Sequence, residues 1–112
     1  MSSTKRESSR IAALEAADAV VGGRLGIIEG CRRLQALVLD LVPDSRVDDD
    51  CVVFIAVDSE TDDLPIGSAR QYWDPAALCR EDEKIERAEA MYRDEVVSAC
   101  RNVINRFKDV QF

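Results

Sequence analysis

The stretch "DPAALCREDEKIERAEAMYRDEVVSACRNVINRF", residues 74–107, decides the fold that this sequence predicts. Aspartate followed by proline is a typical helix start, because the Asp side chain caps the first turn and proline suits the first helical position. Apolar residues then recur at helical spacing without an interrupting glycine or proline: Leu78, Ile85, Ala88, Tyr92, Val96, Ala99, Val103 and Phe107. We therefore expect one long C-terminal helix, with Glu81 to Lys84 as the place where a bend would fall because the apolar pattern lapses there.

Two further helices are predicted upstream. The first begins at Arg10 and ends at Gly22-Gly23, because interior glycines disfavour a helix. The second runs from about residue 24 to residue 41 and is stopped by Pro43. Their apolar stripes are Ile11, Leu14, Ala17 and Val21 in the first, and Ile27, Cys31, Leu34, Val38 and Leu41 in the second.

The segment "CVVFIAV", residues 51–57, is ambiguous between a strand and a buried helix. We predict a helix, because no other segment reads as a strand that could pair with it and satisfy its backbone groups. The acids at residues 48–50 also favour a helix N-terminus at this point. A strand that pairs across a dimer is the alternative.

These elements predict an all-α fold, a small antiparallel helical bundle with a long C-terminal helix. Residues 1–9, "MSSTKRESS", are expected to form a disordered N-terminal tail, and residues 10–112 a single helical domain. No run of about 18 apolar residues is present, so we expect no membrane span.

The net charge of −7 is unevenly placed, because residues 48–63 hold seven carboxylates and no basic residue. Such a surface repels phosphate backbones, so nucleic acid is not an expected ligand. A basic protein partner is the natural complement. A solvated acidic loop that only keeps the protein soluble is the alternative.

Much enzymatic chemistry is excluded by the absence of histidine. No Ser-His-Asp, Cys-His or HExxH arrangement can form. The four cysteines form no C-x-x-C pair, so we expect buried, reduced thiols in a cytoplasmic protein. An EF-hand register that begins at Asp58 fails at Asp63 and Ala69. We therefore expect no catalytic residue, no metal and no cofactor.

The segment "DSETDDLPIGSARQYW", residues 58–73, is the candidate site. In one hypothesis its acids contact a partner's cations while two aromatic residues act as anchors: Asp58, Glu60, Asp62, Asp63, Tyr72 and Trp73. In another the segment is a structural corner in which Arg70 reaches back to Glu60 or Asp62, and this corner comprises Ser59, Pro65, Gly67 and Arg70. In a third, Glu60, Asp62 and Arg70 line a ligand-binding or enzymatic pocket beside Trp73.

Three glycines, Gly22, Gly26 and Gly30, would share one face if the helix were continuous. That spacing is typical of a close approach between helices, and a homodimer through this face is a further hypothesis.

The pattern S-E-T-D-x-x-P-x-G-x-x-R-x-x-W, here Ser59 to Trp73, resembles that of a family of small standalone bacterial proteins of unassigned function. The similarity continues through "DPAAL", "DEKIERAE" with Tyr92, and Ala99-Cys100 before "INRF", and it covers roughly residues 25–107. It implies a bacterial, cytoplasmic, single-domain protein, and it gives no reaction or ligand.

Small size, the acidic segment and the missing catalytic sets together favour an interaction protein over an enzyme. The most concrete form of this hypothesis is an immunity protein that neutralises a cognate, basic, nuclease-type toxin by binding to it.

Overall fold

The structure of the chain is a computed structural model that describes residues 2–110. Its α-helices are α1 (Ser2–Val21), α2 (Ile27–Leu41), α3 (Cys51–Glu60) and α4 (Pro75–Phe107), and its 3-10 helices are η1 (Ser45–Val47) and η2 (Gly67–Tyr72). The part of the chain that is described contains no strand. The predicted all-α fold with a long C-terminal helix is therefore confirmed.

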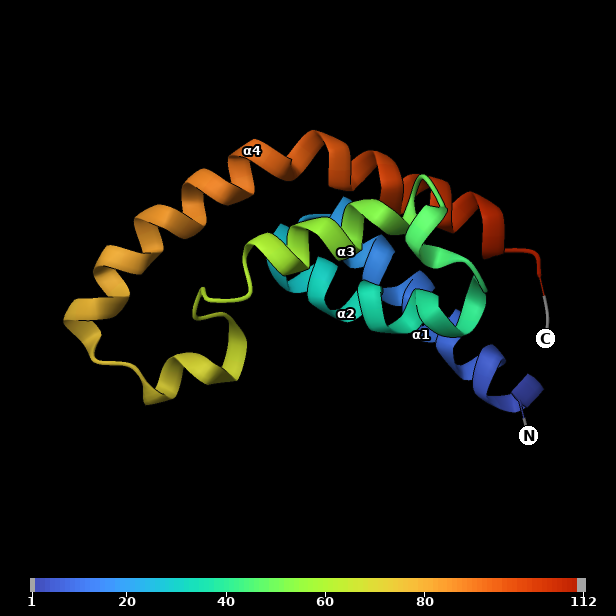
Figure 1. Cartoon of the computed structure of the whole chain (residues 1–112), viewed down its shortest axis with the longest axis horizontal. Helices are drawn as coiled ribbons and strands as arrows, with labels where there is room; N and C mark the ends of the chain where they lie inside the picture. Colours follow the sequence, from blue (N-terminus) through green and yellow to red (C-terminus); the bar gives the residue numbers. More distant parts are fainter. Residues whose placement is uncertain (1, 111–112) are drawn as a thin grey trace.

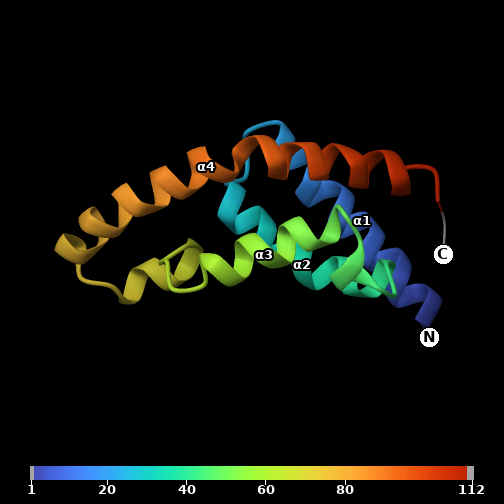
Figure 2. The same ribbon diagram turned by 45° about the horizontal axis from the view of Figure 1, so that its top comes forward.

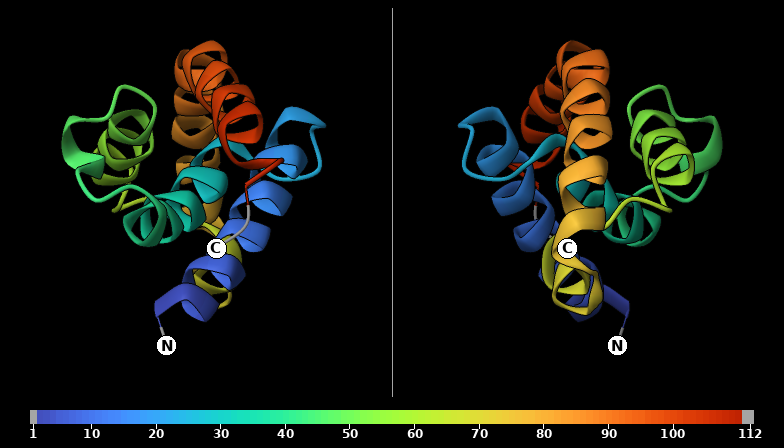
Figure 3. Two further views of the ribbon diagram at one scale, coloured as in Figure 1. Left: turned by 90° about the vertical axis from the view of Figure 1, so that its right-hand side faces the viewer. Right: turned by 90° about the vertical axis from the view of Figure 1, so that its left-hand side faces the viewer.

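The helices α1, α2 and α3 lie side by side in chain order, and α4 runs across them (Figures 1 and 2). Seen end-on, α1 and α3 lie on either side of α4 (Figure 3). Successive α-helices run in opposite directions, and the connection from α3 to α4 is the longest of the three (Figure 1). The core fills the space where all four meet and contains fully buried side chains of each: Ala13, Ala17, Cys31, Leu34, Val38, Phe54, Val96, Cys100 and Val103.

Helix α1 begins at Ser2 instead of Arg10, so the stretch expected to be a disordered tail continues the helix. Two arginines of α1 bind the C-terminal ends of other helices, where carbonyl groups lack partners within their own helix. Arg6 donates to the carbonyls of Asp40 and Leu41 at the end of α2. Arg10 donates to the carbonyl of Phe107 at the end of α4 over 2.9 Å. These contacts are long-range, which is why local polarity alone predicted a tail. Met1 and residues 111–112 lie outside the described residues.

The glycine pair ends α1 as predicted, and Gly23 adopts a φ of +77°, which suits glycine. The chain then turns, and α2 begins only at Ile27. Gly22, Gly26 and Gly30 therefore do not share one helix face, and the predicted glycine face is wrong. Gly30 does permit a close helix approach, because a Cβ there would lie 2.3 Å from Cγ2 of Val20 in α1.

Residues 51–57 are helical, as predicted. The N-terminal end of α3 is capped by Asp48, whose Oδ1 accepts from the backbone N–H groups of Asp50 and Cys51, both over 3.1 Å. Asp74 caps α4 in the same way, since it accepts from Ala77 N over 3.3 Å. The acids before α3 are thus part of the helix start.

Helix α4 is continuous through Glu81 to Lys84, and it curves along its length (Figure 1). Only the C-terminal half of its apolar stripe is fully buried, namely Val96, Ala99, Val103 and Phe107. The N-terminal half, with Leu78, Ile85, Ala88 and Tyr92, is half-buried and extends past the ends of the other helices. This half carries the connection from α3, where the candidate site lies.

Candidate functional site

Two of the candidate partner-binding acids pair with side chains of neighbouring helices, Asp58 at a half-buried position and Glu60 at an exposed one. Asp58, in the last turns of α3, lies with its Oδ1 3.6 Å from Nε of Arg32 in α2. Glu60 accepts a hydrogen bond of 2.7 Å from the hydroxyl of Tyr92 in α4, which raises the pKa of Tyr92. These acids were expected to lack partners, because the residues that bind them lie far away in the sequence.

Arg32 also holds the turn that follows α3. Its Nη2 donates to the carbonyls of Thr61 and Leu64. Thr61 is buried, and its hydroxyl donates to the carbonyl of Val57 over 2.6 Å. One guanidinium therefore binds two carbonyl groups of the turn that follows α3. No sequence pattern predicts this role, because Arg32 lies in an ordinary amphipathic helix.

Arg70 is bidentate, as expected, but its partner is a different carboxylate. Its Nη1 and Nη2 bind the two carboxylate oxygens of Asp82 in α4 at 2.8 and 3.2 Å, and not Glu60 or Asp62. The Arg70 hydrogen bond lowers the pKa of Asp82. Nη1 also donates to the carbonyl of the buried Pro65. The predicted corner is therefore not self-contained, because α4 closes it.

The turn at the corner needs the predicted glycine. Gly67 adopts a φ of +65° at the start of η2, a conformation that L side chains rarely adopt. A Cβ there would also lie 3.2 Å from Oε1 of Glu29 in α2. Ser59, by contrast, is exposed, and its side chain forms no hydrogen bond within residues 2–110.

The pocket expected beside Trp73 is not supported by these contacts. In the described structure Glu60, Asp62 and Arg70 make no contact with one another, since Glu60 binds Tyr92 and Arg70 binds Asp82. A groove of about 670 Å³ lies elsewhere, between α1 and α2. The three side chains thus do not converge on one substrate position, as acid–base chemistry would require.

Four of the candidate residues are exposed, and their side chains form no hydrogen bond or ion pair within residues 2–110. Asp62 and Asp63 are exposed in the turn after α3, and within the described chain neither forms an ion pair or a side-chain hydrogen bond. At the end of η2, Tyr72 is 84% exposed and Trp73 is 38% exposed. We call these four residues, Asp62, Asp63, Tyr72 and Trp73, the acidic–aromatic face.

The acids that precede α3 bind the C-terminal half of α4. Nη1 of Arg106 lies 2.9 Å from Asp48 and 3.3 Å from Asp50, and Asn102 donates to Asp50 over 2.9 Å. The Arg106 guanidinium beside Asp48 lowers the pKa of that carboxyl to about 2. These two acids therefore stabilise the packing of α3 on α4 and are not available to a partner.

Glu89 of α4 caps the N-terminus of α2 from outside that helix. Its two carboxylate oxygens accept from the backbone N–H groups of Ile27 and Ile28 at 3.1 and 2.7 Å. The preceding Gly26 offers no side chain for this purpose, and a Cβ at Gly26 would lie 3.0 Å from Oε1 of Glu89. The helix dipole favours a carboxylate at this position. The sequence contains no local signal for this contact.

The thiols are all free, and three of them, Cys31, Cys51 and Cys100, are buried while Cys79 is exposed. Burial raises the pKa of each of these three buried thiols to about 12. No group of three or more acidic or thiol side chains within residues 2–110 is arranged to hold a metal ion. Nor is any helix in that range long and apolar enough to cross a membrane.

A family model described as a protein of unknown function, DUF2489, matches residues 2–103. The chain belongs to the DUF2489 family. The match extends back to residue 2, so α1 belongs to the family region, although the sequence pattern suggested a similarity only from about residue 25. No curated protein and no solved structure matches the chain. Membership in DUF2489 therefore assigns no function. The feature of the chain that supports a functional proposal is the acidic–aromatic face.

Proposed function

We propose that this protein is a binding protein that docks a basic partner protein through the acidic–aromatic face. In its most concrete form, it is a cytoplasmic immunity protein that neutralises a cognate nuclease-type toxin. The observation that carries the proposal is the contrast between acids that pair with side chains of neighbouring helices and acids that form no such pair. Asp62 and Asp63 remain unpaired beside a segment that ends in Tyr72 and Trp73.

Unpaired surface carboxylates and exposed aromatic rings in one short surface segment are typical of the parts of an interface that set encounter rate and affinity. The carboxylates attract a cationic partner, and aromatic residues supply buried anchors with little loss of side-chain entropy. Tyr72 suits the anchor role because it is 84% exposed at the end of η2 and packs little against its own chain. The Arg70–Asp82 pair fixes the segment that presents it, so the face is preorganised.

A role without catalysis agrees with the available side chains. The chain contains no histidine, and the acids nearest to the face are bound to Arg32 and Tyr92. The reduced state of the four cysteines is what a cytoplasmic protein would show. An immunity protein needs only a complementary surface, and this surface carries the charge that a basic nuclease lacks.

The test is a binding experiment with the full chain as bait in extracts of the source organism. D62N/D63N removes two charges from the acidic–aromatic face. D44N/D49N removes two exposed charges near the opposite end of α3 and is the matched control. Any captured protein is then expressed alone and together with the bait, and its toxicity and its affinity for each variant are measured.

We expect a basic partner whose toxicity is suppressed by the wild-type chain. D62N/D63N should weaken binding by at least about tenfold, and D44N/D49N should leave it nearly unchanged. A partner that binds both variants equally well would exclude this face as the site. A captured partner that is not toxic would exclude the immunity role while keeping a binding role.

A further inference from the structure

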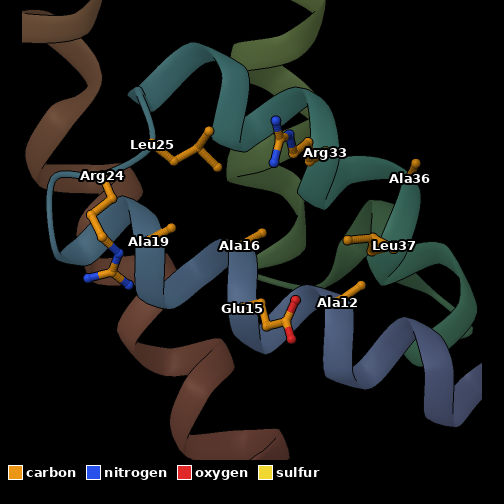
Figure 4. A pocket seen from close by; sticks show the side chains of 9 residues that line it. All are labelled: Ala12, Glu15, Ala16, Ala19, Arg24, Leu25, Arg33, Ala36 and Leu37. Carbon is orange, nitrogen blue, oxygen red and sulfur yellow. The ribbon is translucent and has the colours of Figure 1, made fainter.

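A groove lies between α1 and α2 (Figure 4), and none of the residues that line it belongs to the acidic–aromatic face. Its floor is made of small side chains, Ala12, Ala16 and Ala19 from α1 and Ala36 from α2. Leu25 and Leu37 line it from the α2 side. Small residues on both helices let another helix pair approach closely.

Opposite charges border the groove on its two sides. Glu15, on the α1 side, is exposed and forms no ion pair within the described chain. Arg33, on the α2 side, has a side chain that is 58% exposed and is 3.3 Å from Glu29 of its own helix. That exposed pair contributes little, so Arg33 is free to take a second carboxylate.

The register of the two helices places these charges at the same level. Gly30 of α2 lies beside Val20 of α1, and Ser9 donates to Asp40 over 2.6 Å near the other end. Because α1 and α2 are antiparallel, these contacts fix which residues lie at the same height along the two helix axes. The numbers of two such residues add up to about 49 or 50. Glu15 is therefore level with the turn of α2 that holds Arg33.

We propose that this groove is an interface for a second copy of the chain, arranged around a two-fold axis that runs along the groove. Such an axis places α1 of each copy over α2 of the other. It also leaves the position of every residue along the groove unchanged. Each Glu15 then faces the partner's Arg33, and the contact occurs twice. A partner with a like charge in either place would be repelled, so the border selects a copy of this chain.

The lining side chains also suit a four-helix packing. Ala12 is level with Leu37, and Ala19 is next to Leu25, whose N–H donates to the Ala19 carbonyl over 3.1 Å. The Ala12–Leu37 level in the dimer would hold two alanines and two leucines, a combination of small and large residues that fills a bundle core. The lining residues cover only part of α1 and of α2, so the contact is small and the dimer should be concentration-dependent.

The experiment is sedimentation equilibrium of the full chain across a concentration series, with charge-reversed variants. E15R and R33E each place like charges against each other in a homodimer. An equimolar mixture of the two, or the double variant E15R/R33E, restores two opposite-charge contacts. E83R and R101E reverse exposed residues of α4 and are the matched controls, and circular dichroism checks that every variant is helical.

We expect a wild-type dimer, a Kd at least about tenfold weaker for E15R and for R33E, and recovery in the mixture and the double variant. The controls should dimerise like the wild type. A wild-type chain that stays monomeric at every concentration overturns the proposal. Dimerisation that ignores both reversals, or that the mixture fails to recover, overturns it as well. None of these results depends on whether the acidic–aromatic face binds a toxin.

Discussion

Replacing Glu89 with alanine tests whether α4 holds the start of α2. The substitution removes the two hydrogen bonds of 3.1 and 2.7 Å to the N–H groups of Ile27 and Ile28. Hydrogen bonds to a charged group contribute about 1.5 kcal/mol each or more. Alanine returns about 0.4 kcal/mol of helix propensity, and water replaces part of the loss at this half-buried position. The free energy of unfolding should therefore fall by about 2 kcal/mol.

The assay is urea denaturation followed by circular dichroism, at a concentration low enough to keep the chain monomeric. A loss of this size should also lower Tm by about 8 to 10 °C for a chain of this length. E86A makes the same chemical change at an exposed position of the same helix and should stay within about 0.5 kcal/mol of the wild type. E89Q, which keeps one acceptor oxygen, should fall between them. Equal stability of E89A and E86A would refute the capping role of Glu89.

Three other outcomes follow from the geometry. G30A should destabilise the chain by about 1 kcal/mol, because the clash with Val20 outweighs the gain in helix propensity, and in a V20A background the same substitution should be neutral or stabilising. Asp48 has a pKa lowered to about 2, so its contribution is complete above the ordinary value of 3.8 and is lost as pH falls through about 2. Unfolding measured between about pH 5 and pH 2 should therefore lose about 1 to 2 kcal/mol more in the wild type than in D48N, after allowance for solvent screening, and equal losses would contradict the pairing with Arg106. A thiol reagent should modify the exposed Cys79 at once in the native protein. Cys31, Cys51 and Cys100 should react only on unfolding, because they are buried and have a raised pKa. Rapid reaction of a second thiol in the native protein would contradict their burial.

The order and type of the helices could be predicted because the signals for them are local. The Asp74-Pro75 start, the glycine pair after α1 and the apolar periodicity each act within a few residues. The helical state of residues 51–57 followed instead from the whole chain, because no other segment could pair with this one as a strand. The extension of α1 to Ser2 did not, because Arg6 and Arg10 bind helix ends that are far away in the sequence.

The candidate site was only half predictable, for the same reason. The sequence indicated a bidentate carboxylate partner for Arg70, but the partner is Asp82, which lies on the other side of a turn and a helix start. The roles of Arg32 and Glu89 depend on how α2 packs against α3 and α4, and no spacing in the sequence encodes that packing. Net charge per segment likewise could not separate paired acids from free ones.

The difference between acids that are paired within the fold and acids that are free determines which substitutions can locate a binding site. Neutralising all four acids, Asp58, Glu60, Asp62 and Asp63, would weaken contacts to Arg32 and Tyr92 as well as any contact with a partner. A loss of binding in such a variant would not distinguish a partner surface from a disturbed fold. D62N/D63N leaves those internal contacts intact, so its Tm should match that of D44N/D49N. D58N/E60Q should instead lower Tm, and it should reduce partner binding only to the extent that it disturbs the turn after α3. If D58N/E60Q abolished binding at unchanged stability while D62N/D63N did not, the docking surface would be the side of α3 that faces Arg32 and Tyr92.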